Sequence, residues 1–278
     1  MSNKMVSMLW RAGAILRRGC ALTRREGLLL LMPRWGCVAA VLLLLSPLEA
    51  SNWNVPPGQI GDWSVAANWT GGLPTSSSTV NVSNGGTVTV TLPGAVYANL
   101  ALSNGWVQMS DGTLTGGSPT VTNQGSFIQS GGIHTAGGTV SLNCNYTLSG
   151  AGLLTAKNVQ MGGSGAFTQT GGTNNITNSL SIRAGSQYYY LSGSGRLSAA
   201  TEYVSSGAIM LQAGGVNTVT QLWLAQSGTA TYDLRAGALS ATSEYIGYYP
   251  QDTGMFKHSG GSNTVGTLRV GYDASGTG

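Results

Sequence analysis

The stretch Phe167-Thr-Gln-Thr-Gly-Gly-Thr-Asn174 decides the fold, because its pattern returns along the chain. It recurs as Met210-Leu-Gln-Ala-Gly-Gly-Val-Asn217 and as Phe256-Lys-His-Ser-Gly-Gly-Ser-Asn263. An earlier copy, Phe127-Ile-Gln-Ser-Gly-Gly-Ile-His134, lacks the final Asn. The second glycines of the four copies are separated by 40, 43 and 46 residues. Self-similarity at a period of this size is typical of a stacked array.

A second phrase lies between copies of the first and divides each period into two halves. It begins at Tyr146, Tyr189 and Tyr232, in steps of 43 and 43 residues, and continues with Leu two positions later. A half-period of about 21 residues is enough for one coil with short strands and tight turns. The sequence therefore predicts an all-β fold: a repeat β-solenoid with about 43 residues per repeat, made of two coils. A β-propeller is the alternative, but no blade signature occurs and a propeller has no need of two similar halves.

Apolar-x-apolar triplets occur once per repeat and predict buried strands. They are Leu100-Ala-Leu102, Val140-Ser-Leu142, Leu180-Ser-Ile182, Leu222-Trp-Leu224 and Leu268-Arg-Val270. Glycine-rich turns separate the strands, since glycine adopts positive φ without penalty. No helical periodicity appears after residue 50.

Residues 1–50 are expected to be an export signal and leader. Seven of the 13 basic residues lie there, and an apolar run from Val38 to Leu45 is followed by a Pro47 break and by Ala50. Met32 is an alternative start, and Thr23-Arg24-Arg25 loosely fits a twin-arginine signal. The unbroken apolar part is too short to span a bilayer, so a membrane anchor is disfavoured. We expect an exported protein, at the cell surface or outside the cell.

Residues 51–99 are predicted to form an N-terminal cap and the first strands. The region holds Trp53, Trp63 and Trp69, and the repeats proper are expected over residues 100–278. An array of strands needs its end covered. A carbohydrate-binding aromatic platform is the alternative role for these tryptophans. The chain stops in mid-phrase at residues 271–278, which suggests a fragment of a longer protein.

Composition excludes several classes of function. After residue 50 there are six basic and seven acidic residues, so no basic footprint for nucleic acid or anionic lipid exists. Cys144 is the only cysteine in that region, which leaves no intrachain disulfide or cysteine metal site, and a small apolar role on a strand is expected.

The residues that invite catalytic or metal chemistry receive structural interpretations. His258 falls in the position of Gln in the first phrase, and His134 follows a different glycine pair, so no metal site is predicted. Glu202 and Glu244 occupy identical phrases; two coils would separate them by about 9.6 Å, close to the carboxylate spacing of inverting glycosidases. Repetition alone explains that coincidence. We predict no catalytic residues, no metal and no cofactor.

Two polar columns are predicted to hold the coils together by stacking like side chains. Their members are Asn174, Asn217 and Asn263, and Gln129, Gln169 and Gln212. The Asn positions are expected to adopt positive φ. The run Tyr188-Tyr189-Tyr190 is a candidate surface for stacking sugar rings, although such residues more often cover strands.

The phrases Phe-Thr-Gln-Thr-Gly-Gly-Thr-Asn and Leu-Ser-Ala-x-x-Glu-Tyr resemble repeats of exported bacterial surface proteins. The resemblance is to autotransporter-associated β-strand repeat passengers and to secreted proteins with PEP-CTERM-type sorting signals, and it covers about residues 52–278. It implies a right-handed parallel β-helix-like solenoid and a non-enzymatic role as an adhesin-like passenger or surface stalk, without catalytic residues. The alternative is a β-helix that binds or cleaves polysaccharide. Expected partners are an extracellular polysaccharide, a cell surface, or a second copy bound end to end.

Overall fold

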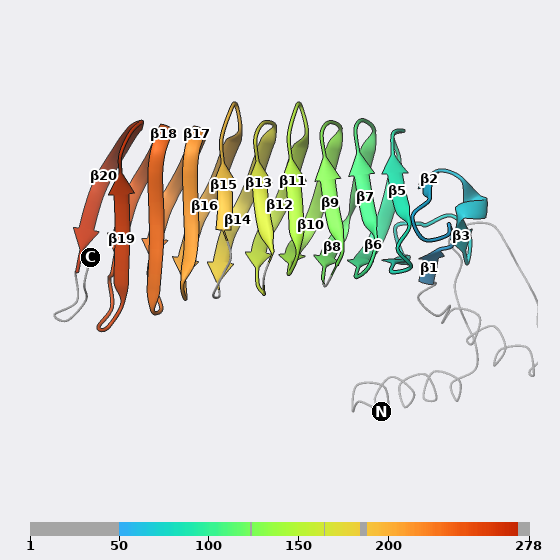
Figure 1. Cartoon of the computed structure of the whole chain (residues 1–278), viewed down its shortest axis with the longest axis horizontal. Coiled ribbons are helices and arrows are strands. Elements are labelled where there is room, and N and C mark those ends of the chain that lie inside the picture. The colour runs from blue at the N-terminus through green and yellow to red at the C-terminus, as the bar shows by residue number, and fades with distance from the viewer. Residues whose placement is uncertain (1–49, 123, 164, 184–187, 272–278) are drawn as a thin grey trace, which may run out of the picture. The chain divides into compact units, whose positions relative to one another are not determined.

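The computed structural model describes residues 50–122, 124–163, 165–183 and 188–271, which form a parallel β-solenoid of about nine turns. Strands account for 67% of it, each turn takes about 21 residues, and no α-helix occurs in the described ranges. One 3-10 turn, η1, covers Ala66–Asn68. The predicted fold class, with two coils in each repeat of about 43 residues, is confirmed. The stacked strands follow one another along a single axis in Figure 1.

Each coil contains a short strand followed by a long one. The short strands are β5 (Thr87–Val90), β7 (Trp106–Met109), β9 (Ser126–Gln129), β11 (Asn145–Leu148), β13 (Ala166–Gln169), β15 (Tyr188–Leu191) and β19 (Thr253–His258). The long strands are β6 (Ala95–Leu102), β8 (Thr113–Val121), β10 (Ile133–Leu142), β12 (Leu153–Met161), β14 (Thr173–Arg183), β16 (Arg196–Ser205) and β20 (Ser262–Val270). In β17 (Ala208–Leu224) and β18 (Thr229–Ile246) the two strands are continuous.

Each strand pairs in parallel with its counterpart in the next coil, so equivalent residues lie in register. We call a set of such residues a column. One inward column runs Phe127, Tyr146, Phe167, Tyr189 and Met210, and continues to Tyr232 and Phe256. Several neighbouring rings in it are parallel, with the centroids of Phe127 and Tyr146 4.7 Å apart. These stacked rings fill the interior, as the alternating apolar residues of the sequence predict.

The tight turn of the first phrase depends on its second glycine. Gly172 and Gly215 have φ of 65° and 69°, in the left-handed region that favours glycine. The following Asn lies within a strand, and Asn217 does not have positive φ. The prediction of positive φ at the Asn positions is therefore wrong, because the glycine already makes the turn.

The N-terminal end of the array is closed by a small non-repeating unit. It consists of β1 (Ala50–Trp53), β2 (Ile60–Asp62), η1, β3 (Trp69–Thr70) and β4 (Thr79–Val82). β1 pairs with β3 in the antiparallel direction and with β4 in parallel. The parallel ladder already includes β4 with β6 and β2 with β5, so coil stacking begins before residue 100.

Three tryptophans form the interior of this end. Trp53, Trp63 and Trp69 are all buried, and the Trp69 ring meets the other two edge to face at centroid distances of 4.7 and 5.0 Å. The Trp69 Nε1–H donates to the Trp63 carbonyl at 2.8 Å. Because the rings face inward, they favour the cap interpretation and cannot serve as an exposed sugar platform.

The predicted leader, residues 1–49, and the final residues 272–278 lie outside the described residues. Within the described residues, no helix is long and apolar enough to cross a bilayer.

Candidate functional site

The interior polar residues are placed by an alternation between two kinds of coil. Gln129, Gln169 and Gln212 share a column, but Leu148 and Leu191 lie between them. The Asn column alternates in the same way: Asn174 and Asn217 are each in register with Leu197 of the coil between them. The predicted stacking of Gln on Gln and Asn on Asn is therefore wrong. Like amides are two coils apart, about 9.6 Å at ordinary strand spacing, which is too far for a direct hydrogen bond.

Instead, a tyrosine of the next coil connects the Gln and the Asn of one coil. The Tyr189 hydroxyl donates to Gln169 Oε1 at 2.6 Å and accepts from Asn174 Nδ2 at 3.0 Å. The Gln169 Nε2 group donates to the carbonyls of Gly172 and Arg196. The same arrangement links Gln212, Tyr232 and Asn217 one repeat later. We call each set a Gln–Tyr–Asn bridge; all its side chains are buried.

A related set lies one repeat earlier, where His134 takes the place of Asn beside Gln129 and Tyr146. It lies in the Asn column and is fully buried, with its ring stacked on Phe127 at 4.8 Å. Its Nδ1 lies 3.2 Å from the Tyr146 hydroxyl, which itself donates to Gln129 Oε1 at 2.8 Å. A hydroxyl has one proton to give, so His134 Nδ1 carries the donated hydrogen and Nε2 accepts from the Tyr97 hydroxyl at 2.9 Å. Burial lowers the pKa of His134 to about 3, which keeps the ring neutral.

His258 keeps one contact of the glutamine that it replaces. It is in register with Leu234 in the Gln column, as the sequence predicts. Its Nε2 lies 3.3 Å from the Gly261 carbonyl, and Gln129 Nε2 likewise donates to the carbonyl of Gly132, three residues on. No group of three or more His, Cys, Asp or Glu side chains that could hold a metal occurs in the described part of the chain.

Glu202 and Glu244 point into the core. They share a column with Leu222 between them, and each side chain is only 1% exposed. Glu202 Oε2 accepts from Asn217 Nδ2 at 3.0 Å, and Glu244 Oε2 accepts from Asn263 Nδ2 at 3.2 Å. Burial raises the pKa of Glu202 to about 7, against the opposing hydrogen bond from Asn217. Buried carboxyls cannot contact a polysaccharide, so this pair does not provide the glycosidase geometry that the spacing suggests.

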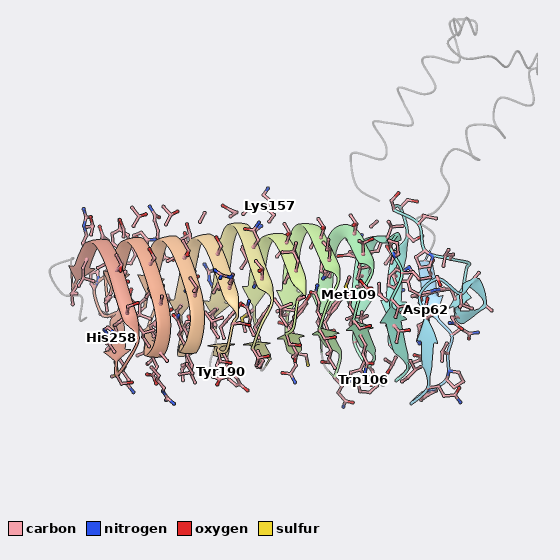
Figure 2. All side chains as sticks on the ribbon, turned by 90° about the horizontal axis from the view of Figure 1, so that it is seen from above. Asp62, Trp106, Met109, Lys157, Tyr190 and His258 are labelled. Carbon is pink, nitrogen blue, oxygen red and sulfur yellow. The ribbon has the colours of Figure 1, made fainter. Side chains whose placement is uncertain are left out.

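The run Tyr188–Tyr190 does not form one surface, because successive residues of a strand face opposite sides. Tyr189 is fully buried, whereas Tyr188 is 46% exposed and Tyr190 is half-buried. Tyr190 projects outward in Figure 2. The prediction of a sugar-stacking platform is therefore wrong for Tyr189, which stacks on Phe167 at 4.6 Å inside the core.

A different set of aromatic residues gathers on the outside. Tyr203, Trp223 and Tyr245 form an outward-facing column, which we call the outer aromatic column. The rings of Trp223 and Tyr245 are 4.0 Å apart and nearly parallel. Guanidinium groups lie near both ends: Arg183 is 5.8 Å from the Tyr203 ring centroid, and Arg269 is 5.6 Å from that of Tyr245.

Two further tyrosines extend this surface beyond the end of β18. The Tyr248 ring crosses the edges of Trp223 and Tyr245, with interplanar angles of 71° and 81°. Tyr249 packs edge to face on Tyr248 at 4.9 Å and is 40% exposed. This cluster was only partly visible in sequence, where Tyr248-Tyr249 is a pair and the other three rings are separated by 20 or more residues. The sequence does carry a signal for Tyr203, Trp223 and Tyr245: each is the middle residue of a triplet whose first and third residues face inward, so the ring itself is expected to face outward.

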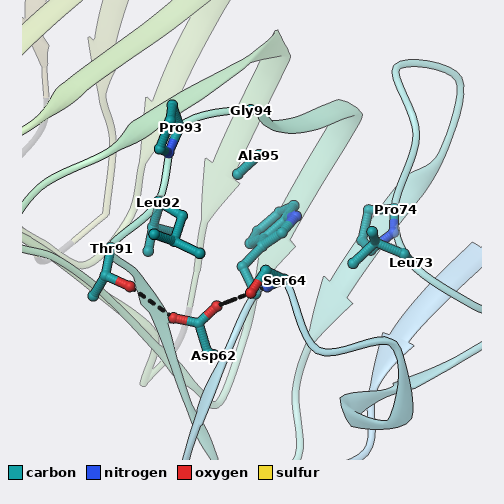
Figure 3. A pocket seen from close by; sticks show the side chains of 11 residues that line it. Asp62, Ser64, Leu73, Pro74, Thr91, Leu92, Pro93, Gly94 and Ala95 are labelled. Atoms are coloured by element: carbon teal, nitrogen blue, oxygen red, sulfur yellow. Dashed lines mark hydrogen bonds between the residues drawn. The ribbon is translucent and has the colours of Figure 1, made fainter.

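A small pocket of about 150 Å³ lies beside the cap, between Asp62 and the segment 90–95 (Figure 3). Ligand pockets commonly have volumes of about 300–1,000 Å³. Asp62 Oδ1 accepts from Ser64 at 2.6 Å, and Oδ2 accepts from Thr91 at 2.9 Å. Partial burial raises the pKa of Asp62, but these hydrogen bonds outweigh it and hold the pKa below its usual value. The carboxylate is therefore committed to the turn, and the pocket is too small for a sizeable ligand.

Cys144 is half-buried in the bend between β10 and β11 and packs against the core. The small apolar role expected for it fits this packing, but the bend replaces the expected strand.

Comparison with known proteins adds no relative to this description: no family model, no curated protein and no solved structure matches the chain.

Proposed function

We propose that this protein is an exported, non-enzymatic β-solenoid that serves as a structural passenger or surface stalk. The observation that carries the proposal is the use of the buried polar side chains. Each Gln–Tyr–Asn bridge joins two coils, and both glutamates lie inside the core. These polar residues thus hold a rod together.

Three sequence features support export and a surface role. Residues 1–50 combine basic residues, an apolar run and a small residue in the order of a signal peptide. The repeat phrases resemble those of autotransporter-type and PEP-CTERM-type surface proteins. The body is close to neutral, which fits a spacer better than a binder of polyanions.

The test is to express the full chain in a bacterium with its own leader and to locate the mature protein. We expect its N-terminus to be processed near Ala50 and the array to be accessible to external protease on intact cells. Protein that retains the leader and stays in the cytoplasm would contradict the proposal. New reducing ends or unsaturated sugars in a panel of polysaccharides would contradict the non-enzymatic part.

Polysaccharide binding is a second candidate function, and the outer aromatic column with Tyr248 and Tyr249 favours it. Exposed aromatic rings offer apolar faces to sugar rings, and the adjacent Arg183 and Arg269 supply hydrogen-bond donors. Trp223 and Tyr245 cover one face of each other, so Tyr249 is the ring to test first.

Affinity electrophoresis in gels that contain single polysaccharides tests this candidate. Tyr249→Ala should abolish any retardation that the parent shows, and Trp223→Ala should weaken it. Tyr188→Ala is the matched control, because Tyr188 is exposed to a similar extent but lies on the short strand β15, outside the cluster. Retardation that Tyr188→Ala removes and Tyr249→Ala leaves intact would assign binding to another surface.

A further inference from the structure

A line of amides and carboxyls in β14, β16, β17, β18 and β20, buried except for the half-buried last member, has more hydrogen-bond acceptors than donors. Its members, which we call the Asn–Glu chain, are Asn174, Glu202, Asn217, Glu244 and Asn263. Among the described residues, each of them has a buried side-chain oxygen without a hydrogen-bond donor: the Oδ1 atom of the three Asn residues and the Oε1 atom of both Glu residues. An orphaned buried acceptor costs about 1–3 kcal/mol, so five in one line need an explanation.

The known hydrogen bonds fix the direction in which each carboxyl points. Glu202 Oε2 accepts from Asn217 in the coil that follows it, and Glu244 Oε2 accepts from Asn263 in the coil that follows it. The other oxygen of each carboxyl has no hydrogen-bond donor. The preceding coil holds Asn174 in the case of Glu202, and Asn217 in the case of Glu244. Both offer an orphaned Oδ1.

Asn174 and Glu202 both act on the Tyr189 hydroxyl. Asn174 Nδ2 donates to the Tyr189 hydroxyl at 3.0 Å, and the Glu202 charge acts on that hydroxyl. In the following repeat, Asn217 Nδ2 donates both to Glu202 Oε2 and to the Tyr232 hydroxyl. Each carboxyl therefore lies in a coil between the coils of two Asn residues: one of its oxygens accepts from the following Asn, and the other has no donor.

We propose that Glu202 and Glu244 are buried proton-binding sites, in which the carboxyl Oε1 holds a proton and donates it to the Oδ1 of the preceding Asn. One proton on Glu202 satisfies both Glu202 Oε1 and Asn174 Oδ1. One proton on Glu244 satisfies both Glu244 Oε1 and Asn217 Oδ1. The chain then runs without interruption from Asn174 through Glu202, Asn217 and Glu244 to Asn263. These two protons satisfy four of the five orphaned oxygens, and the fifth, Asn263 Oδ1, lies in the last described coil.

Burial and the neighbouring groups favour the protonated form. An ionised carboxylate is costly to bury without a cation, and no Lys or Arg side chain is hydrogen-bonded or ion-paired to either glutamate in the described chain. The titratable groups that act on the pair are Tyr189 and Tyr232, both neutral, and His258, which acts to lower the pKa of Glu244. Burial raises the pKa of both carboxyls, that of Glu202 from 4.5 to about 7, so the folded chain binds this proton several hundred times more tightly.

The consequence is that the solenoid becomes more stable as the pH falls from about 7 to about 4.5. The folded-state pKa of Glu202 lies above its unfolded value, so its contribution to stability is complete below about pH 4.5. The contribution is lost as the pH rises through about 7. Glu202 therefore stays protonated at pH values at which an ordinary glutamate is ionised.

Carbon-13 NMR of the full chain, labelled at the glutamate side-chain carboxyl, tests the proposal directly. The sequence contains four glutamates, so the spectrum is simple, and Glu202→Gln and Glu244→Gln assign the two buried signals. We expect the Glu202 signal to stay at its protonated position at pH 6 and to titrate near pH 7. Titration of Glu202 near 4.5, the ordinary value, would overturn the proposal.

Glu202→Gln gives a second, independent readout, because its amide copies a protonated carboxyl. Its Nε2 can donate to Asn174 Oδ1 and its Oε1 can accept from Asn217. We expect a urea midpoint close to that of the parent at pH 5 and higher than that of the parent at pH 8.5. Asp233→Asn is the control, because it removes an acid whose partner is the exposed Arg235. A Gln variant less stable than the parent at both pH values, or a parent stabilised by added Na⁺, K⁺ or Ca²⁺ instead of by protons, would overturn the proposal.

Discussion

Tyr97 and His134 are 37 residues apart in sequence, yet the Tyr97 hydroxyl is hydrogen-bonded to His134 Nε2 at 2.9 Å across an intervening coil. The intervening coil places Gly116 in register with Tyr97. A Cβ atom added at Gly116 would fall on the Tyr97 ring. The hydrogen bond therefore requires a residue without a side chain in the coil between its two partners.

Gly116→Ala is accordingly expected to destabilise the protein by about 1–3 kcal/mol, because a rigid aromatic ring must move within a packed core. Urea unfolding of the variant and the parent measures the difference. Gly137→Ala is the control, since the nearest atom to its added Cβ would be 3.6 Å away. A Gly116→Ala variant as stable as the parent would mean that Tyr97 has room to shift.

His134 should make the fold sensitive to acid. Its folded pKa of about 3 lies below the ordinary 6.5, so its stabilising effect is complete above pH 6.5 and is lost as the pH falls toward 3. The expected slope is about 1.4 kcal/mol per pH unit in that range. Glu202 has the opposite slope between 4.5 and about 7, so the net loss should become visible mainly below pH 4.5.

His134→Asn isolates this effect, because Asn occupies the equivalent place in later repeats. The difference in unfolding free energy between parent and variant should grow in favour of the parent from pH 3 to pH 6.5. Denaturant titrations at several pH values measure it. A difference that stays constant across this range would show that His134 does not resist protonation.

Asn217→Leu should cost about 1–3 kcal/mol, because it leaves Glu202 Oε2 without its donor and removes one partner of the Tyr232 hydroxyl. The backbone is not the reason, since Gly215 makes the turn. The matched control is Thr218→Leu at the next, outward-facing position, which should change stability by less than about 0.5 kcal/mol. Equal effects of the two substitutions would mean that the amide contributes nothing specific.

Trp69→Ala should destabilise the N-terminal end far more than the rest of the array. The side chain is buried between Trp53 and Trp63, and such truncations cost about 3–5 kcal/mol. Coils contact only their neighbours, so the loss should be local. Hydrogen exchange should accelerate in β4 and β5 and stay unchanged in β17 and β18. Trp106→Ala, at a partly exposed position, is the control. Uniform acceleration along the array would contradict a separate cap.

The sequence predicts the solenoid and its two-coil repeat because both depend on periodicity. The partners of the polar residues depend on which half-repeat lies above which, and identity at 43 residues does not reveal that Leu191 lies between Gln169 and Gln212. A signal for His134 was present, since it stands where Asn174 stands after the glycine pair. A signal for Glu202 was present too: Glu202-Tyr-Val204 occupies the place of the Leu222-Trp-Leu224 triplet, which identifies the carboxyl as inward.

From the coil of Gln129 onward, the alternation of coils makes the buried hydrogen bonds depend on whether coils are lost singly or in pairs. A coil that supplies Gln and Asn must be followed by a coil that supplies Tyr, because the Tyr189 hydroxyl satisfies amides of the coil before it. Loss of one Tyr-bearing coil of about 21 residues, such as that of Tyr189, would place two amide coils together with no hydroxyl between them. Gain or loss of two coils restores every partner. Deletion of the one coil that carries Tyr189 is therefore expected to destabilise the protein more than deletion of that coil together with the next, although both deletions preserve the strand ladder.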